Sequence, residues 1–299
     1  MARSPVTPLA VPARTRTVRR LSTLSGLAGT FLLYTLLIVV LIAMAVPFAW
    51  MLAGSFKTNT DMFGNALTLL PTAPTMQNYI ALLNGSQVPY MQQYANSAIV
   101  AAGTTLLALA VSSLTGYGFA KFEFAFKRPL FIIVLATLMV PVQITLVPLF
   151  LLMHTFGWLD HLQAVIVPAG FGAFGVFLMR QSMLAVPAEL LEAARIDGAS
   201  ELRLYWQIAL PLARAGLTVL GILTFLNAWN DFLWPIIVLQ SDTNMTVPVG
   251  LASLNGLYHV RYGMIDAGAF LSTVPIIAAF IVLRKQFLSG LTAGALKGA

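Results

Sequence analysis

Long apolar stretches without charged residues alternate along the chain with short polar segments. Six of these stretches approach the roughly 20 residues that a helix needs to cross a bilayer. They cover residues 27–52, 95–120, 129–153, 162–179, 215–239 and 267–283. Pro141, Pro148 and Pro168 interrupt the third and fourth stretches, so we expect kinks there, and the sixth is short enough to begin earlier. The pattern predicts an all-α, polytopic membrane protein with six transmembrane helices.

The polar segments divide this membrane domain from its tails. Residues 1–25 combine Pro, Ser, Thr and Arg and predict a disordered, basic cytoplasmic tail. The apolar run that follows is too long for the core of a signal peptide, so we expect the first helix to remain in the protein. The six-helix domain then covers residues 26–285, and a second cytoplasmic tail covers 286–299. Segments 53–94 and 240–266 are expected to cap the outer side.

Composition agrees with this reading and excludes most soluble classes. The chain is 59% hydrophobic and 9% charged, with a mean hydropathy of +0.85, whereas soluble domains carry about a quarter charged residues. It contains no cysteine, which excludes a disulfide framework and a thiolate metal site. The net charge of +7 does not indicate nucleic-acid binding, because the basic residues are scattered between apolar stretches.

The positions of the basic residues predict the orientation. Lys and Arg near the ends of spans stay on the cytoplasmic side of a membrane. With six spans and the N-terminus inside, fifteen of the seventeen basic residues are cytoplasmic, and Lys57 and Arg261 are outside. Adding or removing one span would spread these residues over both sides. Both termini are therefore expected in the cytoplasm.

The longest cytoplasmic connection, residues 181–214, has the punctuation of two short helices. Pro187 with Glu189 in the first turn predicts a helix start, and Gly198 predicts its end, so one helix covers about 187–197. Ser200 can cap a second helix that runs toward Pro211, where the missing amide allows a bend. Small side chains at the middle of the first helix would let another surface approach closely. The alternative is an amphipathic segment that lies on the membrane surface.

This loop resembles the EAA loop of permease subunits in binding-protein-dependent ABC importers. The resemblance rests on Glu192-Ala193-Ala194, Asp197-Gly198 and Ile208-Ala209-Leu210-Pro211. Further segments resemble the carbohydrate-uptake branch of the MalG type: Ser55-Phe56-Lys57-Thr58, Asn78-Tyr79, Asn96-Ser97, Met139-Val140-Pro141, Trp229-Asn230-Asp231 and Gly290-Leu291-Thr292-Ala293-Gly294. The chain departs from many relatives at Asp231, where they carry Glu.

The resemblance implies a multi-pass permease of the bacterial cytoplasmic (inner) membrane that imports a sugar or oligosaccharide. Another polar solute, such as a polyol or glycerol phosphate, remains the alternative. Expected partners are a second homologous permease subunit, two ATPase subunits and an extracytoplasmic substrate-binding protein. This chain would bind no cofactor, because ATP and Mg would bind to the ATPase subunits. The residues implied in ATPase coupling are Glu192, Ala193, Ala194, Asp197, Gly198, Ile208, Leu210 and Pro211.

A polar stripe in the fifth apolar stretch suggests a path for the solute. Asn227, Asn230, Asp231 and Trp234 are spaced i, i+3, i+4 and i+7, so a continuous helix would place them on one face. Amide and carboxylate groups suit sugar hydroxyls, and Trp229 or Trp234 could supply an aromatic face. The alternative is hydrogen bonding between helices, with Asp231 near the outer interface.

Other patterns predict no catalysis. The run from Gly170 to Gly175 fits G-x-G-x-x-G, but it lies within an apolar stretch and predicts close helix packing instead of a dinucleotide site. His154, His161 and His259 lack metal-ligand spacing to carboxylates, so no metal site is expected. The chain has no Gly-Lys pair and therefore no P-loop. An intramembrane enzyme or a secondary transporter would need clustered ionisable groups or similar halves, and neither is evident.

Overall fold

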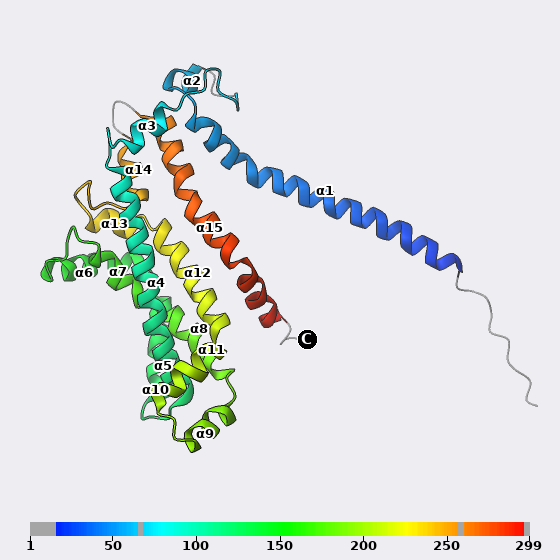
Figure 1. Ribbon diagram of the computed structural model, residues 1–299, viewed down its shortest axis with the longest axis vertical. Helices are drawn as coiled ribbons and strands as arrows, with labels where there is room; N and C mark the ends of the chain where they lie inside the picture. The colour runs from blue at the N-terminus through cyan, green and yellow to red at the C-terminus, as the bar shows by residue number, and fades with distance from the viewer. Residues whose placement is uncertain (1–15, 65–67, 256–259, 296–299) are drawn as a thin grey trace, which may run out of the picture. The chain divides into compact units, whose positions relative to one another are not determined.

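The computed structural model describes residues 16–64, 68–255 and 260–295, and these are helical apart from their connections (Figure 1). In chain order the helices are α1 (Arg16–Ser55), α2 (Asn59–Gly64), α3 (Gln77–Leu83), α4 (Tyr90–Lys121), α5 (Lys127–Ala136), η1 (Thr137–Met139), α6 (Val142–Thr155), α7 (Gln163–Gly170), α8 (Ala173–Leu184), α9 (Ala188–Ile196), α10 (Glu201–Leu204), η2 (Tyr205–Ala209), α11 (Leu210–Leu212), α12 (Arg214–Asn230), α13 (Leu233–Val238), α14 (Val247–Ser253) and α15 (Tyr262–Ala295).

Three helices are long and apolar enough to cross a membrane unaided: α1 from Gly29, α4, and α15 as far as Ile281. Three more candidates are pairs of helices bent at a break. The bend is 102° between Lys127–Met139 and α6, 43° between α7 and α8, and 77° between Glu201–Leu212 and α12. The described residues thus hold three to six candidate spans. This confirms the prediction of an all-helical polytopic membrane protein, while the count of six stays a prediction.

Proline lies at or near each break. Val140 and Pro141 have extended backbone between η1 and α6, as the expected kink requires. Pro168 lies in the last turn of α7, and Pro211 precedes the break at Ala213 by two residues. Because proline lacks the amide that continues a helix, the chain can turn sharply at little further cost.

The chain divides into two compact units, residues 1–51 and 52–299. The first consists mainly of α1, whose described side chains before residue 51 are exposed and apolar on all faces. A helix of this kind suits lipid or a partner helix. Of the expected N-terminal tail, residues 1–15 lie outside the described residues. The structure starts α1 at Arg16, within that expected tail, where the prolines that oppose a helix have ended at Pro12.

In the second unit α4 is central and packs against α7, α8 and α12, while α15 packs on α12, α3 and α14 (Figure 1). Glycines allow the closest approaches. A Cβ atom at Gly116 of α4 would lie only 2.7 Å from the backbone nitrogen of Arg180 in α8, and one at Gly175 would lie 2.3 Å from Ser112 Oγ. The prediction of close helix packing around the glycine run therefore fits this contact between α8 and α4.

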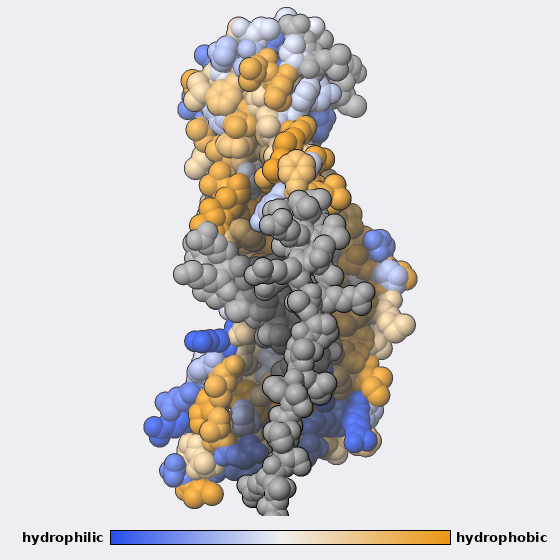
Figure 2. Space-filling view, turned by 90° about the vertical axis from the view of Figure 1, so that its right-hand side faces the viewer, coloured by the Kyte–Doolittle hydropathy of each residue, from blue (hydrophilic) through white to orange (hydrophobic). Residues whose placement is uncertain are grey.

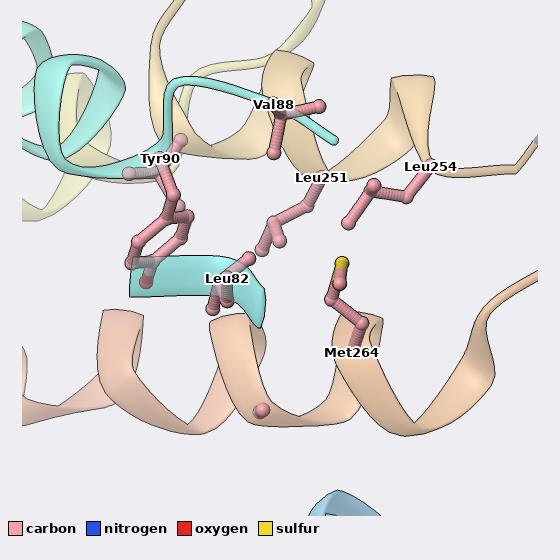
Figure 3. Packing of buried hydrophobic residues seen from close by; sticks show 8 residues of the cluster. Leu82, Val88, Tyr90, Leu251, Leu254 and Met264 are labelled. Carbon is pink, nitrogen blue, oxygen red and sulfur yellow. The ribbon is translucent and has the colours of Figure 1, made fainter. Parts of the chain in front are cut away.

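Buried clusters lie at both ends of the second unit. At one end Leu82, Leu251 and Met264 approach one another from α3, α14 and α15 (Figure 3). Tyr90 joins this cluster, and its hydroxyl donates to the carbonyl of Gly268 at 2.9 Å. Toward the end where α9 lies, Tyr117, Met179 and Tyr205 belong to another buried cluster. Figure 2 shows hydrophilic side chains gathered at the α9 end, below a region where hydrophobic ones prevail.

Candidate functional site

Helix α9 lies at one end of the second unit (Figure 1) and has a well-defined C-terminal cap. Gly198 adopts a left-handed backbone conformation with φ of +84°. Its amide donates to the carbonyl of Arg195 at 3.0 Å, and the amide of Ala199 donates to that of Ala194 at 2.9 Å. This pair of bonds is a Schellman motif, in which glycine avoids the steric cost of its conformation. The predicted helix end at Gly198 is therefore confirmed in the structure.

The loop then continues into the second helix that was predicted to start at Ser200. The Ser200 side chain accepts from the amide of Arg203 at 3.4 Å and caps α10. The helix continues through the π-helical segment η2 to the bend at Ala213. The wider π turn was not foreseen, because no residue type in this stretch demands it.

Polar contacts tie this loop to the C-terminal end of α4. Glu201 accepts two hydrogen bonds from the Arg195 guanidinium, at 2.6 Å from Nε and 3.2 Å from Nη2. The hydroxyl of Tyr117 in α4 donates to the same carboxylate at 3.4 Å. Tyr205 and Ser113 share a buried hydroxyl–hydroxyl bond of 2.7 Å. The loop that carries α9 is thus connected to α4 through direct side-chain contacts.

A second tie lies at the start of α9. Lys121, the last residue of α4, donates from Nζ to the carbonyl of Val186 at 2.6 Å. The loop is therefore held to α4 on both sides of α9.

The exposed surface of the loop is partly apolar. Leu191 is only 2% exposed and anchors α9 to the unit, whereas Ile196 is 86% and Leu202 65% exposed. Of the predicted coupling residues, Glu192, Ala193, Asp197, Gly198 and Pro211 are exposed, while Ala194, Ile208 and Leu210 are half-buried. Large exposed apolar side chains beside small ones are typical of a protein–protein contact.

A cavity of about 600 Å³, lined mainly by α4, α8 and α12, has both apolar and polar side chains in its walls. Its polar lining comes from Thr104, Ser112, Thr224, Asn227 and Asp231. The hydroxyl oxygen of Thr104 is buried and has no hydrogen-bond partner within the described part of the chain. Hydroxyl, amide and carboxylate groups around one cavity can bind a small polar solute.

The structure brings together only part of the predicted polar stripe. Asn227 and Asp231 both line the cavity. Helix α12 ends at Asn230, however, and Asp231 has an extended backbone with φ of −65° and ψ of 129°. The stripe therefore does not lie on one continuous helical face. The physical reason is local, since the Asp231 carboxylate lies against the backbone amides that begin the next helical segment.

Trp229 and the remaining stripe residues, Asn230 and Trp234, do not line this cavity. The indole of Trp229 is 3% exposed and donates to the carbonyl of Ser272 at 3.0 Å. Trp234 is 7% exposed, and its indole donates to the carbonyl of Ala164 at 2.8 Å. Asn230 donates from Nδ2 to the carbonyl of Leu226 at 2.8 Å. These contacts fix the two tryptophans between helices in this structure.

Sequence reasoning missed the hydroxyl groups of the cavity. Thr104, Ala108 and Ser112 are spaced by four residues on α4 and all line it. That spacing of small and hydroxylated residues within an apolar stretch was the available signal.

Polar contacts tie the segment between α6 and α7 to the segment that follows α13. The Asp160 carboxylate accepts hydrogen bonds from the backbone amides of Gln240 and Ser241, each at 2.9 Å. Although partial burial alone would raise the pKa of Asp160, hydrogen bonds from Ser241, Gln240 and Asn244 hold that pKa below its ordinary value. Within the described residues no group of three or more His, Asp or Glu side chains could hold a metal ion, and His259 lies outside them.

Comparisons with known proteins agree on one kind of protein. Residues 108–287 match the family described as binding-protein-dependent transport system inner membrane component. The chain is 37% identical over 254 residues to the arabinooligosaccharides transport system permease protein AraQ of Halalkalibacterium halodurans, covering 84% of this chain and 91% of AraQ. It is 33% identical over 271 residues to the trehalose/maltose transport system permease protein MalG of Thermococcus litoralis, covering 88% of this chain and 96% of MalG.

The fold also matches a solved structure. A chain from the crystal structure of a bacterial ABC transporter involved in the import of alginate superposes with a TM-score of 0.76, at 21% identity. The match covers 93% of this chain and 100% of that one. At this identity the similarity concerns the fold.

Proposed function

The chain belongs to the family of binding-protein-dependent transport system inner membrane components, and from this premise we propose that it forms half of a sugar pathway driven by a separate ATPase. Family membership confirms the predictions of a multi-pass inner-membrane permease of an ABC importer that is not itself an enzyme. The solute, the partners and the roles of individual residues are the proposal.

In the proposed topology six spans cross the membrane and both termini are cytoplasmic. The three bent helix pairs each count as one span, so α9 lies on the cytoplasmic side. Clustered basic residues support this orientation, since Lys121, Lys127, Arg128, Arg180, Arg195, Arg203 and Arg214 belong to the elements at that end. The opposite end, with α2, α3 and α14, then faces the binding protein that delivers the solute.

Helix α9 is proposed to dock on an ATPase subunit. The single observation that carries this role is the exposed surface of α9 joined to α4 through Arg195, Glu201 and Tyr117. ATP and Mg would bind to the two ATPase subunits and not to this chain. Closure of those subunits would push α9, and α4 would carry the displacement to the cavity that Thr104 and Ser112 line.

We propose a neutral sugar or oligosaccharide as the solute. The related permeases named above belong to arabinooligosaccharide and trehalose/maltose systems. The cavity offers hydroxyl and amide groups together with one carboxylate, Asp231, which can accept hydrogen bonds from sugar hydroxyls. The same carboxylate would repel a phosphate ester, so the cavity favours a sugar or polyol over glycerol phosphate.

Within this pathway Asn227 and Asp231 are the proposed contacts to the solute. Trp229, Asn230 and Trp234 would hold α12 and α13 in position around them through the backbone contacts described above. A second homologous permease subunit would complete the pathway.

The test is uptake into vesicles that contain the whole transporter. Labelled arabino-oligosaccharide, lactose, maltose and glycerol phosphate are supplied with the binding protein, with or without internal ATP. The proposal expects ATP-dependent uptake of at least one sugar and loss of that uptake in Asp231→Leu. Uptake driven by an ion gradient without ATP would indicate a secondary transporter and overturn it.

A further inference from the structure

A second polar pocket, of about 730 Å³, lies where the end of α4, the start of α5 and the end of α8 meet. Three cations line it: Lys127, Arg128 and Arg180. Its one carboxylate, Glu123, lies 2.8 Å from Lys127 Nζ and is 91% exposed, so it neutralises only part of this charge. The pocket therefore has a net positive charge and suits an anion.

Arg180 is held in a way that prepares it for a ligand. Its guanidinium carbon lies 4.3 Å from the centroid of the Phe131 ring, so the aromatic face positions the cation. Its Nε atom is buried, yet it donates to no acceptor among the residues that the structure describes. The aromatic contact and the burial of Nε together hold the guanidinium in one position at the wall of the pocket.

The surroundings of the pocket indicate a ligand with an apolar part. Phe124 and Phe126 line it and are 43% and 77% exposed. Exposed aromatic side chains beside cations are typical of the membrane–water interface. The outer surface of α5 continues from the pocket with exposed Ile132 and Ile133, and α5 buries none of its side chains in this chain. Acyl chains could lie along that surface while the headgroup occupies the pocket.

We propose that this pocket binds the phosphate headgroup of an anionic phospholipid in the cytoplasmic leaflet. The leaflet follows from the proposed orientation, but the binding chemistry does not depend on the transported solute. Arg180 and Arg128 contact the phosphate oxygens, and Lys127 adds charge from a side chain that is only 15% exposed. The bound lipid joins α5 to α8 close to Lys121, the last residue of α4.

The test measures lipid binding to the assembled transporter by native mass spectrometry in the absence of ATP. Its result does not depend on transport, so failure of the proposed function would not be mistaken for failure of lipid binding. Dioleoylphosphatidylglycerol, dioleoylphosphatidylcholine and inorganic phosphate are titrated separately. The proposal expects phosphatidylglycerol to bind more tightly than phosphatidylcholine. Each of R128Q and R180Q should weaken phosphatidylglycerol binding about fivefold.

The control is Arg214→Gln, which removes an exposed cation at the same end of the unit but outside the pocket. It should leave the affinity for phosphatidylglycerol unchanged. Arg128 is exposed, so its variant tests the site even if Arg180→Gln disturbs packing against Phe131. Equal affinity in native protein and Arg128→Gln would overturn the proposal. Binding of inorganic phosphate in place of phosphatidylglycerol would also overturn it, in favour of a soluble anion.

Discussion

Gly198 shows at the scale of one residue how backbone conformation supports the proposed coupling helix. A Cβ atom there would meet nothing within 4 Å, so any cost of substitution comes from φ of +84° and not from a clash. We predict that Gly198→Ala destabilises the end of α9 by about 1–2 kcal/mol. Faster hydrogen exchange at the Ala199 amide, which closes the motif, would measure this change.

Gly157 provides a matched control. It has φ of +66°, open space at its Cβ position, and the same pair of capping bonds at the end of α6. Gly157→Ala should cost a similar free energy locally but leave ATP-dependent uptake intact, whereas Gly198→Ala should reduce uptake. Equal uptake in the two variants would argue against a special role of α9.

A substitution at Glu201 distinguishes an effect on stability from an effect on coupling. The Arg195–Glu201 pair is partly exposed, with side chains 39% and 44% accessible, so its loss should cost at most about 1 kcal/mol. We nevertheless predict a clear fall in uptake for Glu201→Gln, because the neutral side chain weakens the link that runs from Arg195 through residue 201 to Tyr117. Glu123→Gln removes a comparable exposed pair that does not touch α9 and should retain uptake.

The sequence allowed the end of α9 at Gly198 and the cap at Ser200 to be predicted, because both follow from backbone rules that act over a few residues. The Arg195–Glu201 pair could not be predicted in the same way. It requires the turn at Gly198 to bring α10 back to α9, and short-range backbone rules do not specify that contact between two helices.

At the scale of helices, the contact between α4 and α8 depends on the absence of a side chain at Gly116. We predict that Gly116→Ala destabilises the protein by about 1–3 kcal/mol, since its Cβ would press on the backbone of α8. Gly118→Ala, two residues further along the same helix, meets nothing within 4 Å and should be neutral or slightly stabilising. Thermal unfolding in detergent compares the two, and equal midpoints would contradict the close contact.

The tie between residues 160 and 240–244 should respond to acid. A carboxyl group whose folded-state pKa is depressed stabilises the fold above its unfolded pKa, and this contribution is lost as the pH falls through the folded value. The Asp160 tie should therefore persist at pH 7 and weaken only below about pH 4. Hydrogen exchange of the Gln240 and Ser241 amides as a function of pH measures this weakening.

Asp160→Asn is the comparison for this pH dependence. These amides should exchange faster in the variant already at pH 7, and the acid-induced increase should disappear after correction for intrinsic exchange rates. No difference between native protein and variant at pH 7 would mean that the hydrogen bonds to Asp160 do not hold this connection.

Prolines in the sequence predict where a helix breaks but not the angle of the break. Pro141 marked the break before α6, yet its 102° bend is much larger than a kink. Beyond the bend, Leu146, Leu149 and Phe150 of α6 pack against the cluster that contains Trp234 and Val238 of α13, and sequence periodicity cannot reveal such a long-range contact. The end of α12 at Asn230 was missed for a related reason, since an apolar run carries no sign that Asp231 will bind backbone amides instead of continuing the helix.

At the scale of the whole molecule, composition and charge were sufficient for the class of protein. Apolar stretches and the positions of Lys and Arg follow from the solvent that surrounds the chain, and they predict a multi-pass membrane protein. The cavity depends instead on how α4, α8 and α12 meet. Asn227 and Asp231 could therefore be proposed from sequence, while Thr104 and Ser112 required the structure.

The central claim is that α9 transmits the action of an ATPase to the pathway. Its most direct test measures ATP hydrolysis and sugar uptake together in vesicles that contain the complete transporter. Glu192→Lys places the opposite charge on the exposed surface of α9, and Asp242→Lys makes the same change on an exposed residue in the segment before α14. We predict that Glu192→Lys inserts normally but loses most uptake, whereas Asp242→Lys retains it. Full ATP-dependent uptake by Glu192→Lys would contradict the account.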